Sequence, residues 1–258
     1  MPDALGAAGA AGAPGAPRAV RLVLLPGMDG TGDLFAPLTA ALGPGAAVDV
    51  VRYSGTQPQS YAELEPLVRA QLPREEPFVL LGESFSGPLA ISIAAAPPPG
   101  LRGLILCCSF ARSPSPGLAL LRGGLLELMM KLLHLDAMRP PMRHMLLGRF
   151  ATPQLAGMLQ GSLRQVSGAV MARRMHEVQR VNVVDKLAQV RVPSMYLQAL
   201  QDRIVPAQAA LVIQRALAGL QVVRFEGPHG LLQAAPAATA QAIDHFCRTL
   251  GDPAPIHP

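Results

Sequence analysis

The feature that most constrains the fold of this 258-residue chain is an alternation of short apolar runs with helix-like stretches. Four of the apolar runs are continuous rather than alternating, as expected for strands that helices cover on both faces. The pattern predicts βαβ units and a mostly parallel sheet of about six strands with helices on both faces. The predicted strands cover residues 20–25, 47–52, 78–81, 104–108, 194–199 and 221–225.

Helix signals fall between these strands and after the last one. Ser60 and Glu63 have the spacing of a capping box, in which each side chain satisfies the other residue's backbone N–H. The apolar residues that follow are predicted to share one helix face, namely Leu64, Leu67, Val68 and Leu72. Further helices are expected over residues 88–96, before the breaker PPPG, and over residues 237–250.

The rhythm changes between the fourth and fifth predicted strands. Residues 113–184 show no strand pattern, and helical segments are expected between 118 and 132, over 153–166 and over 167–181. About 70 residues is too long for a simple crossover. We therefore predict an all-helical cap at 113–184, inserted into an α/β core formed by 18–112 and 185–251. Residues 1–17, which are Gly, Ala and Pro-rich, are expected to be a disordered tail, and residues 252–258 a second tail.

Composition narrows the class of protein. Half of the chain is apolar, which is enough for a large core. Its three cysteines form no CxxC pair, and this favours buried thiols in a reducing compartment. No run of 18 strongly apolar residues free of charge is present, so we expect no membrane insertion and a soluble, cytoplasmic protein. Aromatic residues make up only 4%, and no nucleic-acid-binding motif occurs, so no nucleic acid partner is expected.

The positive charge lies mainly in the predicted cap. Between Ser113 and Arg180 there are nine Arg or Lys and three Asp or Glu, an excess of about +6, whereas the whole chain carries +5. Solvated helix faces are the simpler interpretation. The alternative is that arginines such as Arg139, Arg143, Arg149, Arg173, Arg174 and Arg180 attract an acidic acyl carrier.

The stretch GESFS, residues 82–86, lies between a predicted strand and a predicted helix. A serine flanked by small residues at such a junction is typical of a nucleophile elbow, a strained turn that exposes the serine Oγ. The candidate nucleophile is Ser84. The last small residue of the motif is Ser86 where glycine is usual, and Gly87 follows it.

A serine nucleophile needs a base and a group that orients the base. His229 follows the sixth predicted strand and is the candidate base, and Asp202 follows the fifth and is the candidate acid. The order serine, aspartate, histidine is the one expected here, and all three residues follow carboxyl ends of predicted strands. Asp185 and Asp136 are rival acids in less suitable places.

The glycine-rich stretch LLPGMDGTG, residues 24–32, follows the first predicted strand. A tetrahedral oxyanion needs two preorganised N–H donors, which we assign to the backbone of Met28 and Phe85. Asp29 is expected to shape this loop as a turn former. Glu83, next to the candidate nucleophile, is expected to make a structural salt bridge.

Four elements follow one another along the chain: the glycine-rich stretch, the elbow serine, the aspartate and the histidine. In this order they resemble the α/β-hydrolase superfamily over nearly the whole chain from about Val20. The resemblance implies a minimal six-stranded α/β-hydrolase fold, a Ser–Asp–His triad, ester-type chemistry and a helical lid. The opening LPGMDGTGDLF is also similar to bacterial esterase and thioesterase members.

The predicted function is a serine hydrolase that cleaves small-molecule carboxylic esters or thioesters with an apolar acyl group. An acyltransferase on the same triad and a non-catalytic ligand-binding protein remain alternatives. No cofactor is expected, and the spacing of His134, His144 and His176 fits no metal site. The Met- and Leu-rich stripe of the cap is expected to supply the acyl pocket through Met129, Met130 and Leu133.

Overall fold

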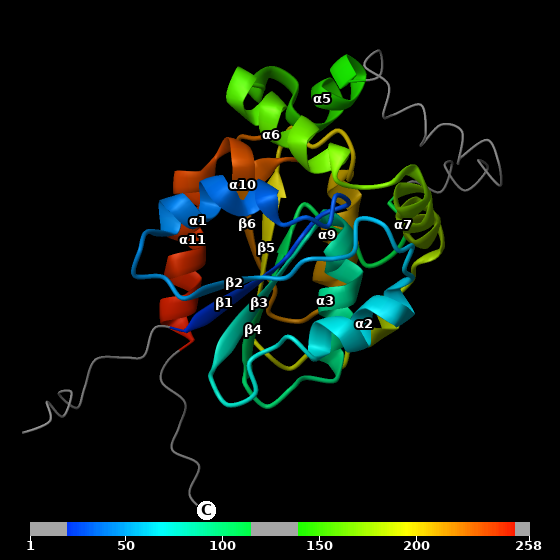
Figure 1. Cartoon of the computed structure of the whole chain (residues 1–258). Helices are drawn as coiled ribbons and strands as arrows, with labels where there is room; N and C mark the ends of the chain where they lie inside the picture. Colours follow the sequence, from blue (N-terminus) through cyan, green and yellow to red (C-terminus); the bar gives the residue numbers. More distant parts are fainter. Residues whose placement is uncertain (1–19, 115–138, 251–258) are drawn as a thin grey trace, which may run out of the picture.

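The computed structural model describes residues 20–114 and 139–250, which form a sheet between two layers of helices (Figure 1). All six strands are parallel, in the order β2-β1-β3-β4-β5-β6. Their bounds are β1 Arg21–Leu25, β2 Val48–Val50, β3 Phe78–Glu83, β4 Leu101–Cys107, β5 Ser194–Ala199 and β6 Gln221–Phe225. The predicted fold class and the six predicted strands are confirmed.

Successive residues of the central strands face two different cores. Val23 and Leu25 of β1 belong to one buried cluster, whereas Leu22 and Leu24 belong to the other. The first face is covered by α2 (Tyr61–Arg69), α3 (Gly87–Ala95), α8 (Val184–Leu187) and α9 (Ala207–Ala216). The second is covered by α1 (Ala36–Leu42), α10 (Leu231–Ala234) and α11 (Pro236–Thr249). Burial on both faces explains the continuously apolar strands.

Helix α2 begins as the sequence predicts. Ser60 is its N-cap, and the reciprocal bonds of a capping box with Glu63 are both present. One expectation for this helix is wrong, because Leu67 is 48% exposed while Leu64 and Val68 are buried. With 3.6 residues per turn, Leu67 lies about 100° around the helix from Val68 and falls outside the buried stripe.

The described part of the insertion between β4 and β5 contains α5 (Arg139–Leu147), α6 (Pro153–Arg164) and α7 (Gly168–Arg180), and no strand. Its two ends lie side by side, because an isolated antiparallel bridge joins Arg112 to Asn182. In Figure 1, α5 and α6 lie above the carboxyl ends of the strands, and α7 lies beside them. The division into core and cap at residues 113 and 184 stays a prediction. The predicted tails and the expected helix between 118 and 132 lie outside the described residues.

Two expectations from composition, buried thiols and the lack of a membrane span, can be compared with the structure. Cys107 and Cys108 are buried, as expected for structural thiols, whereas Cys247 is only partly buried. In the described part of the chain, none of the helices has the length and apolarity needed to cross a bilayer.

Candidate functional site

The elbow sequence forms the predicted sharp turn. Ser84 follows β3 with a φ of 48°, a left-handed value that is costly for a non-glycine residue. Gly82 has no room for a side chain, since a Cβ there would lie 2.8 Å from the Ala90 Cβ and 2.9 Å from the Ser86 carbonyl oxygen. The turn therefore needs its small residue and presents Ser84 at the carboxyl edge of the sheet.

Ser86 is a departure from the usual glycine that the structure explains. Its hydroxyl donates to the Pro26 carbonyl and lies 2.6 Å from the Tyr53 hydroxyl. It thus ties the elbow to the start of the glycine-rich loop. The tight position belongs to Gly87, where a Cβ would lie 1.7 Å from the Ser109 Oγ.

The structure brings the three candidate catalytic residues together. The Ser84 Oγ lies 2.8 Å from His229 Nε2, and His229 Nδ1 lies 2.8 Å from Asp202 Oδ2. The other Asp202 oxygen accepts the backbone N–H groups of Ile204 and Val205, both at 2.8 Å. These bonds fix the carboxylate, so that it can orient the imidazole. The side chains of His229 and Asp202 are only 7% and 6% exposed.

Of the two rival acids, the structure describes only Asp185, which does not reach this site. Asp185 is an exposed residue of α8, and His229 pairs with Asp202 instead. Asp136 lies outside the described residues.

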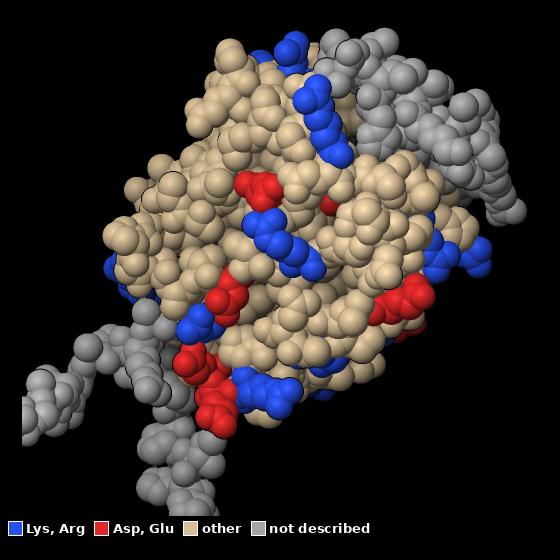
Figure 2. Space-filling model, in the orientation of Figure 1, with Lys and Arg blue, Asp and Glu red and all other residues tan. Residues whose placement is uncertain are grey.

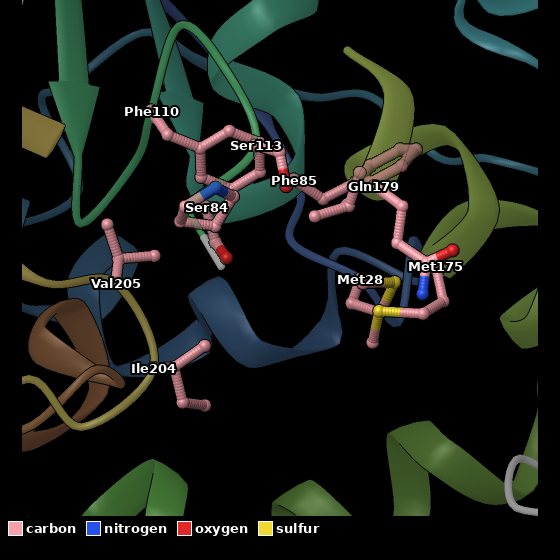
Figure 3. A pocket seen from close by; sticks show the side chains of 11 residues that line it. Met28, Ser84, Phe85, Phe110, Ser113, Met175, Gln179, Ile204 and Val205 are labelled. Carbon is pink, nitrogen blue, oxygen red and sulfur yellow. The ribbon is translucent and has the colours of Figure 1, made fainter. Parts of the chain in front are cut away.

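The glycine-rich loop folds into a turn beside the elbow. The Gly30 N–H donates to the Gly27 carbonyl at 3.1 Å, and one Asp29 oxygen accepts both the backbone N–H and the hydroxyl of Thr31. Asp29 therefore shapes the loop as expected. Met28, in the middle of the turn, borders the same pocket as Ser84 and Phe85 (Figure 3).

Phe85 is held on several sides. The Tyr61 ring stacks on its ring at a centroid distance of 4.7 Å, and the Tyr61 hydroxyl donates to its carbonyl at 2.7 Å. Tyr53 packs edge-on at 6.3 Å. The residue after Ser84 is thus immobilised, which favours a fixed orientation for its backbone.

The pocket at Ser84 is lined mostly by apolar side chains (Figure 3). The core contributes Met28, Phe85, Phe110, Ile204 and Val205, and α7 contributes Met175 and Val178. Ser113 and Gln179 add polar groups. The predicted pocket residues Met129, Met130 and Leu133 lie outside the described residues. Met175 and Val178 were missed, although their three-residue spacing on a helix is the available signal.

The expected salt bridge of Glu83 is wrong. In the described part of the chain Glu83 pairs with no cation, and its Oε1 accepts the Gln233 amide at 3.0 Å. Burial raises the pKa of Glu83 to about 7, and the nearby Asp29 carboxylate adds to the rise. The side chain is buried against the glycine-rich loop, since a Cβ on Gly27 would lie 3.7 Å from Glu83 Oε2.

Arg174 also differs from its expected role as a surface charge. Its side chain is 2% exposed, and its guanidinium donates to backbone carbonyls of the glycine-rich loop. The sequence gives little sign of this, because Arg173 and Arg174 are adjacent and only one of them faces inward on the helix.

No group of three or more His, Cys, Asp or Glu side chains within residues 20–114 and 139–250 is placed to hold a metal ion. His144 and His176 are described, whereas His134 is not.

Comparison with solved structures gives the same fold. An enol-lactonase from Burkholderia xenovorans LB400 superposes with a TM-score of 0.78 at 16% identity, covering 90% of this chain and 92% of that one. An esterase from Exiguobacterium antarcticum gives 0.75 at 14% identity, with 90% and 93% covered. A thermophilic esterase from Thermogutta terrifontis gives 0.72 at 18%, with 90% of each covered. No curated protein matches the chain.

A family model described as the alpha/beta hydrolase family matches residues 22–242, from β1 into α11. The matched range includes the elbow, the glycine-rich loop and the segments that carry Asp202 and His229. The chain belongs to the alpha/beta hydrolase family.

Proposed function

We propose that this protein is a serine hydrolase of carboxylesterase type, which cleaves esters or thioesters with an apolar acyl group through an acyl-enzyme. The observation that carries the proposal is the continuous hydrogen-bonded chain from Ser84 through His229 to Asp202, with 2.8 Å at each step. Family membership and esterase neighbours of the same fold support hydrolase chemistry in general.

Each residue has a defined part in the reaction. His229 Nε2 takes the proton of the Ser84 hydroxyl while the Oγ attacks the substrate carbonyl carbon. Asp202 holds the proton of Nδ1 and stabilises the imidazolium that forms. The backbone N–H groups of Met28 and Phe85 bind the oxyanion.

The remaining steps regenerate the enzyme. His229 returns the proton to the alcohol or thiol as the carbon–oxygen or carbon–sulfur bond breaks, which leaves the acyl group on Ser84. Water then enters, gives a proton to His229 and attacks the acyl carbon. Collapse of the second tetrahedral intermediate releases the carboxylic acid and returns the proton to Ser84.

The pocket supports an apolar acyl part, since most of its lining side chains are apolar. An acidic acyl carrier has less support than the arginine count suggests. Arg174 is buried, Arg173 pairs with Glu177, and Arg149 pairs with Glu226. A small-molecule ester or thioester is therefore the proposed substrate.

Active-site labelling tests the nucleophile. We expect a fluorophosphonate to attach to Ser84, and p-nitrophenyl esters from C2 to C16 to be hydrolysed. Ser84→Ala should abolish labelling and lower kcat by at least about 10³-fold, because the acyl-enzyme cannot form. A folded wild-type protein that neither labels nor hydrolyses any ester would instead support the non-catalytic binding alternative.

A second pair of variants tests the acid. Asp202→Asn should lower kcat by about 10²- to 10⁴-fold, since asparagine favours the wrong imidazole tautomer. Asp185→Asn, a change at an exposed acid, is the matched control and should leave kcat nearly unchanged. The reverse result would assign the acid to Asp185.

A further inference from the structure

Arg174 of α7 is an unusual residue for a helix that covers the pocket. It is among the largest fully buried side chains, at 2% exposed. Burial lowers its pKa, and Asp29 and Tyr53 oppose this effect. Burying a guanidinium costs free energy unless its N–H groups are satisfied. The hydrogen bonds of the Arg174 guanidinium must offset this cost, and an apolar side chain could not form them.

Those contacts converge on the loop beside Ser84. Nη1 donates to the carbonyls of Met28 and Asp29, both at 2.8 Å, and Nη2 donates to the Ser54 carbonyl at 2.9 Å. One planar group thus binds two successive carbonyls of the Gly27–Gly30 turn and one carbonyl of the segment after β2. Lysine, with a single ammonium, cannot reproduce this fork.

The loop fits closely around the guanidinium. Gly30 has a φ of 69°, and a Cβ on it would lie 2.6 to 2.8 Å from the Arg174 guanidinium atoms. The guanidinium also lies over the Tyr53 ring at 5.6 Å and the Phe85 ring at 5.9 Å. Arg174 therefore contacts both residues that we assign to the oxyanion hole, Met28 through its carbonyl and Phe85 through its ring.

We propose that Arg174 is a positioning residue for the oxyanion loop, whose guanidinium holds the Gly27–Gly30 turn with the Met28 N–H directed to the site beside Ser84. The inference rests on the function proposed above. A turn whose carbonyls are anchored on one side keeps its N–H orientation during the reaction, and such preorganisation is what makes oxyanion donors effective. The helix that lines the acyl pocket thereby also supports the catalytic loop.

The test compares Arg174→Met with Arg173→Met. Both changes remove one positive charge from α7, but Arg173 has a 39% exposed side chain paired with Glu177. We expect Arg174→Met to lower kcat for p-nitrophenyl butyrate by about 10²-fold with KM changed by less than about threefold. Affinity for butylboronic acid, which forms a tetrahedral adduct with an active serine, should fall with kcat. Arg173→Met should change neither kcat nor the affinity for butylboronic acid by more than about twofold.

A second readout does not depend on activity. Amide hydrogen exchange over residues 26–34 should be faster in Arg174→Met than in Arg173→Met, because the turn loses its anchor. If Arg174→Met does not fold, Arg174→Lys replaces it, with a loss of kcat of at least about tenfold and the same change in exchange. Equal loop exchange in the folded variants, or an unchanged kcat, overturns the inference. A wild-type protein that binds no boronate and cleaves no ester refutes the proposed function instead, and the exchange comparison still decides whether Arg174 holds the loop.

Discussion

Glu83 places a buried carboxyl group directly before the candidate nucleophile, and this has a consequence for stability. Its pKa in the folded protein is about 7, against 4.5 for an ordinary glutamate. Between these values the folded state keeps a proton that the unfolded state has released. The free energy of unfolding should therefore fall as pH rises from about 4.5 to 7, and this contribution should level off above 7.

Glu83→Gln tests this expectation, because glutamine does not titrate. The rise in pKa from 4.5 to about 7 corresponds to at most about 3.4 kcal/mol. Relative to Glu83→Gln, the wild type should lose up to that amount of unfolding free energy across this pH range, measured by urea unfolding at several pH values. Glu75→Gln, at an exposed acid, is the control and should leave the pH dependence unchanged. Parallel curves for wild type and Glu83→Gln would contradict the expectation.

At the residue scale, the position of a residue next to a predicted strand could be read from the sequence, whereas the burial of a charged side chain could not. The closeness of Ser84, Asp202 and His229 could be predicted because each follows a recognisable strand at its carboxyl end, and parallel strands bring those ends together. Glu83 and Arg174 could not be assigned correctly, because their partners lie far away in the sequence. Gln233 follows Glu83 by 150 residues, and Met28 precedes Arg174 by 146.

At the scale of the element, the elbow has no space for a larger side chain at its glycines. Gly87 opens α3 and packs on Ser109, whose hydroxyl donates to the Ser84 carbonyl at 2.6 Å. Gly87→Ala should displace Ser109 and loosen this bond. We expect a loss of about 2 to 3 kcal/mol in unfolding free energy and a fall in kcat of at least about tenfold.

Gly157→Ala is the matched control, since Gly157 lies in α6 with nothing within 4 Å of an added Cβ. It should raise the unfolding free energy by about 0.5 to 1 kcal/mol, because alanine loses less backbone entropy in a helix. Thermal unfolding and p-nitrophenyl ester assays measure both variants. Similar effects of the two substitutions would show that the elbow tolerates a side chain.

Element boundaries follow the same division between local and long-range causes. The predicted start of β4 at residue 104 is three residues late. Arg102 and Gly103 interrupt the apolar run in the sequence, but pairing with β3 extends the strand back to Leu101. The helices α1 and α9 were not singled out from sequence. By contrast, the N-terminus of α2 was predictable, since its capping box is formed by residues three apart.

On the scale of the whole molecule, some of the arginines behind the charge excess of the predicted cap are buried or paired with acidic residues, namely Arg174, Arg173 and Arg149. The face in Figure 2 carries basic and acidic side chains interspersed, rather than one continuous basic field. The sequence count could not show this, because it cannot tell which arginines face inward or find acidic partners. Among the cap arginines with described side chains, Arg143, Arg149, Arg164 and Arg180 are exposed, and Arg149 pairs with Glu226.

Charge reversal measures what the remaining exposed arginines do. Arg143→Glu should change kcat/KM for a neutral p-nitrophenyl ester by less than about twofold, because surface charges outside the pocket contribute little. We expect an equally small effect on a thioester carried by an acidic acyl carrier protein, since dispersed charges steer weakly. Arg215→Glu, the same change at an exposed residue of α9, is the control. A loss of about tenfold or more at low salt, confined to the carrier substrate and to Arg143→Glu and abolished by added salt, would contradict this expectation and assign carrier docking to the cap.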